Sequence, residues 1–187
     1  LKRNICQGFG MDCNPELIAA AQNNTAKLGF SDRFVLHTGE LADTRFLENL
    51  RMEASPVQLV MANPPWRLVG SGRLPATEAR RKALFGDKGT FPLFASAASS
   101  LLEEDGRFAC IISPDRLQDM LAALDGAGLT PYLLQYIHKQ KTSPATFVLI
   151  EARKGAHAKP SVAEPIALYG PERFFTLESL AFCPFLR

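Results

Sequence analysis

The sequence has few cysteines, no long apolar segment and almost no net charge. Its four cysteines are Cys6, Cys13, Cys110 and Cys183, and none forms a CxxC pair, so neither a zinc site nor a disulfide framework is expected. We expect them to be buried thiols. No apolar run approaches the roughly 20 residues that span a bilayer, and the first ten residues lack the apolar stretch of a secretory signal. These absences predict a cytoplasmic protein without a membrane or metal partner.

The length and composition of the chain fit an ordinary globular protein. Its 187 residues are 47% hydrophobic and 21% charged, which provides enough apolar side chains for a sizeable core and too few charges for a disordered chain. We therefore predict a single domain that spans residues 1–187.

Positive charge is concentrated in two segments, although the formal net charge of the chain is only +2. Residues 67–88 hold six basic and two acidic side chains, and residues 138–160 hold five basic and one acidic. Clusters of this kind suit a polyanion such as RNA, whereas the alternative is that both are solvated surface loops. The candidate RNA-binding residues of the first segment are Arg67, Arg73, Arg80, Arg81 and Lys82.

Short apolar runs alternate with amphipathic stretches, which predicts a parallel sheet covered by helices. Strands are expected at residues 5–12, 33–38, 56–62, 107–112, 131–137 and 146–151. Helices are expected from Asn14 to Gly29, at 43–50, at 91–102 with Gly106 as its end, and at 117–124. The turn between the last two strands is too short for a helical crossover, so they should form an antiparallel hairpin. This order is typical of an α/β, Rossmann-like class I methyltransferase sheet after its first strand.

The pattern of apolar residues also predicts how two segments pack. The helix after Asn14 should bury Ile18, Ala21, Thr25 and Leu28 on one face. The Pro- and Phe-rich tail, residues 161–187, should pack back on the domain, with its aromatic side chains in the core.

The strongest functional motif is Asn63-Pro64-Pro65-Trp66, which follows the apolar strand expected at 56–62. Ligand sites of open α/β sheets lie at the carboxyl ends of such strands, so the motif has the position of a reaction centre. The alternative is a rigid turn without a catalytic role, because prolines commonly follow strands.

The residue types of this motif suit methylation of a planar exocyclic nitrogen, such as an aromatic amine or a carboxamide. The lone pair of such a nitrogen is delocalised, and hydrogen bonds accepted from its N–H groups favour a pyramidal, nucleophilic form. The side-chain carbonyl of Asn63 and the backbone carbonyl of Pro64 are the expected acceptors, and the two prolines hold them in place. Trp66 offers a flat face on which a base can stack.

Two acidic residues are candidates for binding the nucleoside part of S-adenosylmethionine. Asp12 closes the strand expected at 5–12, where nucleoside-binding α/β folds place a carboxylate that accepts hydrogen bonds from both ribose hydroxyls. An aspartate at a strand end is otherwise a helix-capping or turn residue. Glu40 follows the next strand and is the corresponding candidate for the adenine side. Asn63 is a candidate for both the cofactor and the target base.

These motifs resemble those of the bacterial tRNA adenine-N6 methyltransferases, which modify the adenine 3′ to the anticodon of a valine tRNA. The similarity extends over almost the whole chain. NPPW alone is shared with many DNA, RNA and protein methyltransferases, whereas the GSGR segment and the ending EARKG…PIALYGP are more specific to this family. Other matching segments are GFGMDCNPELIAAAQNN, HTGEL, RLVGSGRLPATEARRKALFG, LLEEDGRFACIISPDRL and HKQKTSPATFVLIEARKG.

The resemblance implies a tRNA substrate, S-adenosylmethionine as the cofactor and N6-methyladenosine as the product. It places Asp12 on the cofactor ribose and Glu40 beside the cofactor adenine. The motif Asn63–Trp66 would contact the target base. The basic segment 67–88 would lie near the RNA, so binding should depend on the salt concentration. Trp66 departs from the tyrosine or phenylalanine common at this position but retains an aromatic face.

One part of this family's fold is missing before Asp12. Class I methyltransferases begin with a strand and a glycine-rich turn under the cofactor, and we expect neither in this chain. Residue 1 is Leu, so we expect the natural chain to start further upstream. The missing strand would pair centrally, between the strands at 5–12 and 56–62, and its loss would leave unpaired backbone groups. The domain, incomplete at its N-terminus, should bind the cofactor poorly.

Two other functions are compatible with these residues. A glutamine methyltransferase of the release-factor type also uses an Asn-Pro-Pro-aromatic turn, but the basic segment after Trp66 argues against it. A non-catalytic RNA-binding module would keep the fold without the cofactor loop, but the intact Asn63 and Trp66 argue against that. The upstream gene sequence would separate these alternatives, since a strand and a glycine-rich turn there would favour the enzyme.

Overall fold

The computed structural model describes residues 7–68, 77, 81, 83–155, 159–172 and 174–183. The chain divides into two compact units, residues 1–55 and residues 56–187, and each unit contains its own sheet. The single domain expected from the sequence stays a prediction. Four residues that the sequence singles out lie outside the described residues: Cys6, Arg73, Arg80 and Lys82.

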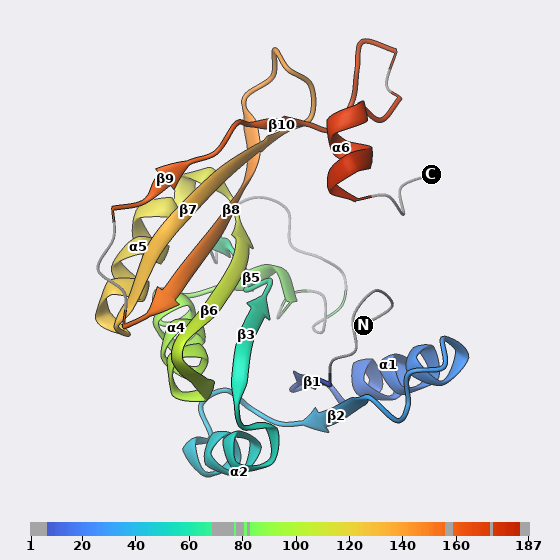
Figure 1. Cartoon of the computed structure of the whole chain (residues 1–187), viewed down its shortest axis with the longest axis vertical. Helices are drawn as coiled ribbons and strands as arrows, with labels where there is room; N and C mark the ends of the chain where they lie inside the picture. Colours follow the sequence, from blue (N-terminus) through green and yellow to red (C-terminus); the bar gives the residue numbers. More distant parts are fainter. Residues whose placement is uncertain are drawn as a thin grey trace. The chain divides into compact units, whose positions relative to one another are not determined.

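The described part of the first unit, residues 7–55, consists of two parallel strands and two helices (Figure 1). Its elements in chain order are β1 (Gly8–Asp12), α1 (Pro15–Lys27), β2 (Phe34–Thr38) and α2 (Thr44–Ala54). β1 and β2 pair along their whole length, with Asp12 opposite Thr38. These elements confirm the predicted order, and α2 extends beyond its expected end at residue 50.

Local sequence signals determine both ends of α1. The side chain of Asn14 accepts a hydrogen bond from the backbone N–H of Glu16 at 2.9 Å. At the other end Gly29 has a φ of 70°, and the N–H of Phe30 donates to the carbonyl of Thr25 at 2.8 Å. This pattern is a Schellman turn, which needs a left-handed residue and therefore favours glycine.

The covered face of α1 is narrower than predicted. Ile18 is buried, Ala21 and Thr25 are half-buried, and Leu28 is 65% exposed. The prediction for Leu28 is wrong because this residue caps the helix beyond its last turn, where the chain already reverses direction. The half-buried Phe30 takes the covered position instead. Helical spacing alone thus predicts a buried face of α1 that is one residue longer than the observed one.

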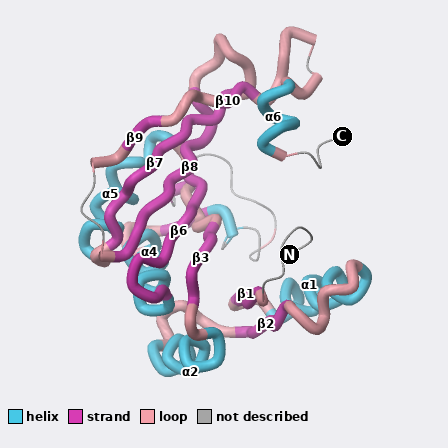
Figure 2. The backbone as a smooth tube through the Cα atoms, viewed as in Figure 1, coloured by secondary structure: helices cyan, strands magenta, loops and turns pink. Residues whose placement is uncertain are grey.

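The second unit is built on a six-stranded mixed sheet (Figures 1 and 2). Its strands are β3 (Val57–Ala62), β6 (Leu102–Ile112), β7 (Leu129–His138), β8 (Ala145–Lys154), β9 (Ser161–Val162) and β10 (Ile166–Ala167). The strand order is β10-β7-β8-β6-β3, and β9 pairs with β7. β3 is parallel to β6, whereas β8 is antiparallel to both β6 and β7, which confirms the predicted hairpin. Among the described strands, β3 pairs on one side only.

Helices α4 (Thr90–Leu101) and α5 (Leu117–Gly126) pack on one face of this sheet (Figure 1). The residues of the resulting core that are at most 1% exposed include Phe91, Phe108, Met120, Leu124 and Val148. The remaining elements are β4 (Arg67–Leu68), β5 (Phe85–Gly86), the 3-10 helix η1 (Pro114–Arg116) and α6 (Leu177–Phe182). Within the described ranges, no helix is long and apolar enough to cross a membrane.

The boundary between α4 and β6 differs from the prediction. Helix α4 ends immediately before Leu102, so Gly106 lies inside β6 and not at the end of a helix. The ladder to β3 shifts between Leu102 and Arg107, and the intervening residues bulge from it. In this bulge Asp105 has a φ of 62°, and a Cβ on Gly106 would lie 2.8 Å from the carbonyl oxygen of Glu103. Gly106 is therefore required by the close packing within the bulge and does not end the helix.

The described part of the tail, residues 161–172 and 174–183, packs back on the second unit, as predicted, but two of its aromatic side chains are exposed. β9 and β10 both pair in parallel with β7. In α6 the buried Ser179 donates a hydrogen bond from its hydroxyl to the carbonyl of Leu168 at 3.1 Å. Phe174 and Phe182 are 73% and 59% exposed. The core prediction is wrong for these two. Phe182 ends the short helix α6, which buries only Ser179, and Phe174 lies before that helix in the chain.

Replacing Met120 by alanine should lower the free energy of unfolding of this unit by about 2–5 kcal/mol, because a fully buried side chain leaves a cavity. Met61→Ala is the matched control, since Met61 is 76% exposed and its loss should cost less than about 1 kcal/mol. Urea denaturation followed by the fluorescence of Trp66, the single tryptophan, would measure both. An equal loss of unfolding free energy in the two variants would contradict the placement of Met120 in the core.

Candidate functional site

The motif Asn63–Trp66 lies at the carboxyl end of β3, as predicted. The side chain of Asn63 is exposed and makes no hydrogen bond to any described residue. Pro64 is fully buried, and Pro65 and Trp66 are half-buried. The first residue of the motif is thus free to bind a ligand, while the second residue anchors the chain in the core.

Close packing against β5 holds the backbone of the motif. The rings of Pro64 and Pro65 fix the φ angles of two successive residues at about −65°. Directly after the motif, β4 pairs in parallel with β5. A Cβ on Gly86 of β5 would lie 2.7 Å from the carbonyl oxygen of Pro65 and 2.7 Å from the hydroxyl of Thr90. Only glycine therefore allows β5 to approach the motif this closely.

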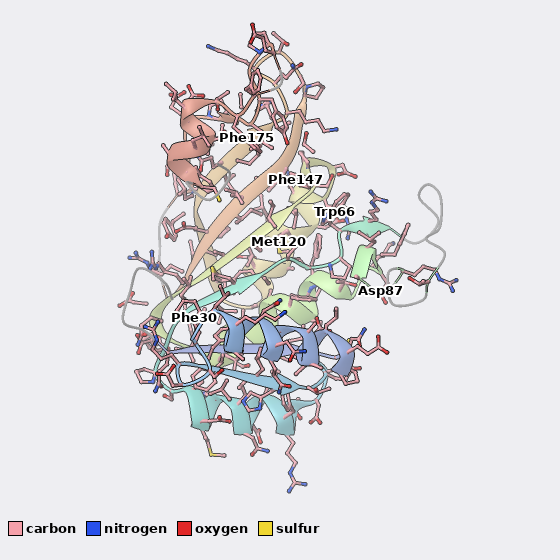
Figure 3. The ribbon with its side chains drawn as sticks, turned by 90° about the vertical axis from the view of Figure 1, so that its right-hand side faces the viewer. Phe30, Trp66, Asp87, Met120, Phe147 and Phe175 are labelled. Atoms are coloured by element: carbon pink, nitrogen blue, oxygen red, sulfur yellow. The ribbon has the colours of Figure 1, made fainter. Side chains whose placement is uncertain are left out.

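Aromatic contacts orient the indole ring of Trp66. The ring meets that of Phe147 on β8 in a T-shaped arrangement, with 6.0 Å between the centroids and an interplanar angle of 76° (Figure 3). The guanidinium of Arg67 lies over the indole at 5.3 Å from its centroid. These contacts fix the plane of the ring, whereas stacking of a base on Trp66 stays a prediction.

Sequence motifs do not identify Arg116, yet this residue contacts the Asn63–Trp66 motif directly. It is 4% exposed, and its Nη1 donates a hydrogen bond to the backbone carbonyl of Trp66 at 3.0 Å. The sequence signal that could have identified Arg116 is its position in the segment directly after a strand. The segment Ser113–Arg116 follows β6 as the motif follows β3, and these two strands are parallel neighbours. Segments after neighbouring parallel strands meet at one edge of a sheet.

Asp12 and Glu40 lie at one edge of the two-stranded sheet of the first unit. The carbonyl of Asp12 accepts a hydrogen bond at 3.1 Å from the N–H of Gly39, which precedes Glu40. Oδ1 of Asp12 accepts from the N–H of Asn14 at 2.8 Å, as expected of a turn residue. Its Oδ2 has no hydrogen-bond partner among the described residues, and Glu40 is exposed. Both carboxylates thus keep acceptors available to a ligand.

Solved structures identify the fold of the chain. A predicted O-methyltransferase from Agrobacterium tumefaciens matches 97% of this chain and 88% of its own, with a TM-score of 0.68 and 18% sequence identity. The fold is that of a class I methyltransferase. A geranyl diphosphate C-methyltransferase from Streptomyces coelicolor A3(2), solved with S-adenosyl-L-homocysteine, matches 82% of this chain and 64% of its own, with a TM-score of 0.52 and 11% identity.

Curated relatives support the resemblance to tRNA methyltransferases. Two proteins from strains of Porphyromonas gingivalis, both named tRNA1(Val) (adenine(37)-N6)-methyltransferase, are 33% identical to this chain over 113 residues. The match covers 59% of this chain and 42% of each relative, so the chain matches less than half the length of these relatives. No family model matches the chain.

Two of the predicted RNA-binding residues belong to the described part of this class I methyltransferase fold. Arg67 and Arg81 are both exposed, and the backbone N–H of Arg81 donates to the carbonyl of Thr77 at 3.1 Å. Arg67 lies beside the motif because it follows Trp66 in the chain. Contact of these arginines with RNA stays a prediction.

The predicted site residues of the methyltransferase fold form two groups. Asp12 and Glu40 come together in the first unit. The Asn63–Trp66 motif and Arg67 come together in the second unit, with Arg116 as an additional member. The first group has the acceptors that suit a nucleoside, and the second group has the exposed amide that suits a target nitrogen.

The three cysteines that the structure describes differ in exposure. Cys110 is 4% exposed, Cys183 is half-buried and Cys13 is exposed. Burial raises the pKa of Cys110 to about 12. The prediction of buried thiols is confirmed for Cys110 and wrong for Cys13, because Cys13 lies in the turn between β1 and α1.

Iodoacetamide at about pH 8 should modify Cys13 in the folded protein and leave Cys110 unmodified. The thiolate is the reactive form, and a pKa of about 12 leaves only about one Cys110 in 10⁴ as thiolate at that pH. Mass spectrometry of the alkylated peptides would measure both sites, with Cys13→Ser as the control. Both cysteines should react in urea. Modification of Cys110 at the Cys13 rate without urea would contradict this assignment.

Proposed function

We propose that this protein is an S-adenosylmethionine-dependent methyltransferase that methylates N6 of an adenine in tRNA. The observation that supports the proposal most strongly is the Asn63 side chain, which is exposed at the carboxyl end of β3 and has no hydrogen-bond partner among the described residues. The curated relatives are named for methylation of adenine 37 in tRNA1(Val). A tRNA substrate would also place the protein in the cytoplasm.

The Asn63–Trp66 motif suits the nitrogen chemistry of this reaction. The amine of adenine is a poor nucleophile because its lone pair is delocalised into the ring. The side-chain carbonyl of Asn63 and the backbone carbonyl of Pro64 would accept hydrogen bonds from the two N–H groups and favour a pyramidal nitrogen. The buried ring of Pro64 restrains the backbone from which both acceptors project. Since well-oriented groups reach effective molarities of about 10⁵ M or more, no strong base is needed.

The acceptors of the first unit fit the nucleoside part of S-adenosylmethionine. When bound, this cofactor supplies a methyl group attached to a positively charged sulfur. Oδ2 of Asp12 has no hydrogen-bond partner among the described residues and would accept from a ribose hydroxyl. Glu40 is exposed next to Gly39 and would accept from the adenine of the cofactor.

Positive charge after the motif favours RNA over a protein as the substrate. Arg67 and Arg81 are exposed, and the sequence places Arg73, Arg80 and Lys82 in the same basic segment. Arginine and lysine side chains bind phosphates, which a glutamine-bearing protein substrate does not provide. The charge thus supports tRNA methylation rather than glutamine methylation.

Transfer of labelled methyl groups in a cell extract would test the proposed function. The protein, expressed from the whole of its gene, would be mixed with labelled S-adenosylmethionine and an extract that contains both RNA and protein. We expect the label in tRNA, recovered as N6-methyladenosine. Label in protein would instead indicate a glutamine methyltransferase, and no label would indicate a non-catalytic RNA-binding module.

Asn63→Ala should lower the rate of methyl transfer by about 10²-fold or more, because the target nitrogen loses a positioned acceptor. Affinity for S-adenosylmethionine should be largely kept. Asn63→Asp retains an acceptor oxygen and should retain part of the activity. Gln58→Ala is the matched control, since it removes an exposed amide from β3, the strand that precedes Asn63. Single-turnover kinetics with tRNA would measure all three variants, and an undiminished rate in Asn63→Ala would exclude the proposed role.

A further inference from the structure

Arg116 is a buried cation that contacts three separate parts of the second unit. Its Nη1 donates to the carbonyl of Trp66 at 3.0 Å, and its Nε donates to the carboxylate of Asp119 on α5 at 2.7 Å. Its guanidinium lies 4.5 Å from the centroid of the Phe91 ring on α4. Arg116 is 4% exposed, whereas the side chain of Asp119 is 61% exposed. The ion pair therefore joins a buried cation to a surface carboxylate.

The chemistry of this position is unusual for a packing role. A guanidinium keeps its charge when it is buried, so water must be replaced by hydrogen bonds and an aromatic face. An apolar side chain would fill the space against Phe91 without that desolvation. What an apolar side chain would not provide is a donor for the Trp66 carbonyl. The fixed fork of an arginine binds this carbonyl and Asp119 at the same time.

The hydrogen bond from Arg116 acts on a part of the motif that the prolines leave free. The two proline rings fix φ at Pro64 and Pro65. Close packing of Gly86 against the Pro65 carbonyl limits rotation about the ψ angle of Pro65. The orientation of the Trp66 carbonyl still depends on the ψ angle of Trp66, and the hydrogen bond from Arg116 holds it. The three constraints together cover successive residues of the turn.

We propose that Arg116 is a positioning residue that locks the Asn63–Trp66 turn in the conformation that receives the target base. The proposal rests on the proposed methyl transfer at Asn63, although its first test requires no reaction. Arg116 acts through the backbone of Trp66. Since a displacement of about 1 Å can cost about 10²-fold in rate, a loosened turn should lower kcat by up to that factor. The KM for S-adenosylmethionine should change little.

The fluorescence of Trp66 provides the first test, because it is the single tryptophan of the protein. Acrylamide quenching and the emission maximum would be measured on the folded protein without cofactor or RNA. Arg116→Met should increase quenching and shift the emission to longer wavelength, because the released turn exposes the indole. Arg116→Lys keeps a cation that can reach the Trp66 carbonyl and should give a smaller change. Asp119→Asn removes the negative charge that pairs with Arg116. Its quenching of Trp66 should lie between that of the wild type and that of Arg116→Met.

Lys154→Met is the matched control for these variants. Lys154 also donates to two backbone carbonyls, those of Ser99 at 2.9 Å and Leu102 at 2.8 Å, at the end of α4. This change removes a partly buried cation from the same unit but not from the turn. It should leave the quenching of Trp66 unchanged. Circular dichroism would establish that each variant is folded.

Kinetics with tRNA provide the second test and separate the two proposals. We expect a lower kcat in Arg116→Met, partial rescue in Arg116→Lys and an unchanged kcat in Lys154→Met. Unchanged quenching in both Arg116 variants would overturn the positioning role. The same conclusion would follow if both variants unfolded while Lys154→Met stayed folded, because Arg116 would then hold the whole unit. Increased quenching together with a wild-type protein that methylates no RNA would reject the proposed function but would still show that Arg116 holds the Asn63–Trp66 turn.

Discussion

The parallel pairing of β3 with β6 determines where the candidate reaction centre lies. Because both strands run in the same direction, their carboxyl ends reach one edge of the sheet. The segments that follow them, Asn63–Trp66 and Ser113–Arg116, therefore become neighbours although Trp66 and Arg116 are 50 residues apart. One segment presents an exposed amide, and the other supplies a buried cation. Neither segment could form this arrangement alone.

The rigidity of the motif comes from groups that have few alternative conformations. Proline rings, the close approach of Gly86 and the edge-to-face contact of Trp66 with Phe147 restrict the backbone and the indole. The Asn63 side chain, in contrast, is solvated and has no hydrogen-bond partner among the described residues. A ligand that binds there would displace water without breaking a described hydrogen bond of the protein. Little reorganisation is then required when the ligand arrives.

Features that depend on neighbouring residues could be predicted from the sequence. The caps of α1 at Asn14 and Gly29 and the position of Asn63 after an apolar strand are of this kind. The start of β6 is predicted wrongly because its first residues, 102–106, are mostly polar and bulge from the ladder, so they lack the apolar pattern of a strand. Arg116 was missed because its partner lies far away in the chain, and a lone arginine after a strand has no local signature. Contacts across the sheet need the strand order before they can be predicted.

The unpaired side of β3 has a consequence for the reaction centre. Leu59 and Met61 on this strand are 42% and 76% exposed, and among the described strands only β6 pairs with it. An unpaired strand edge with apolar side chains readily accepts another strand. A strand that pairs there would end directly beside Asn63. Whatever covers this edge would therefore form part of the wall of the reaction centre.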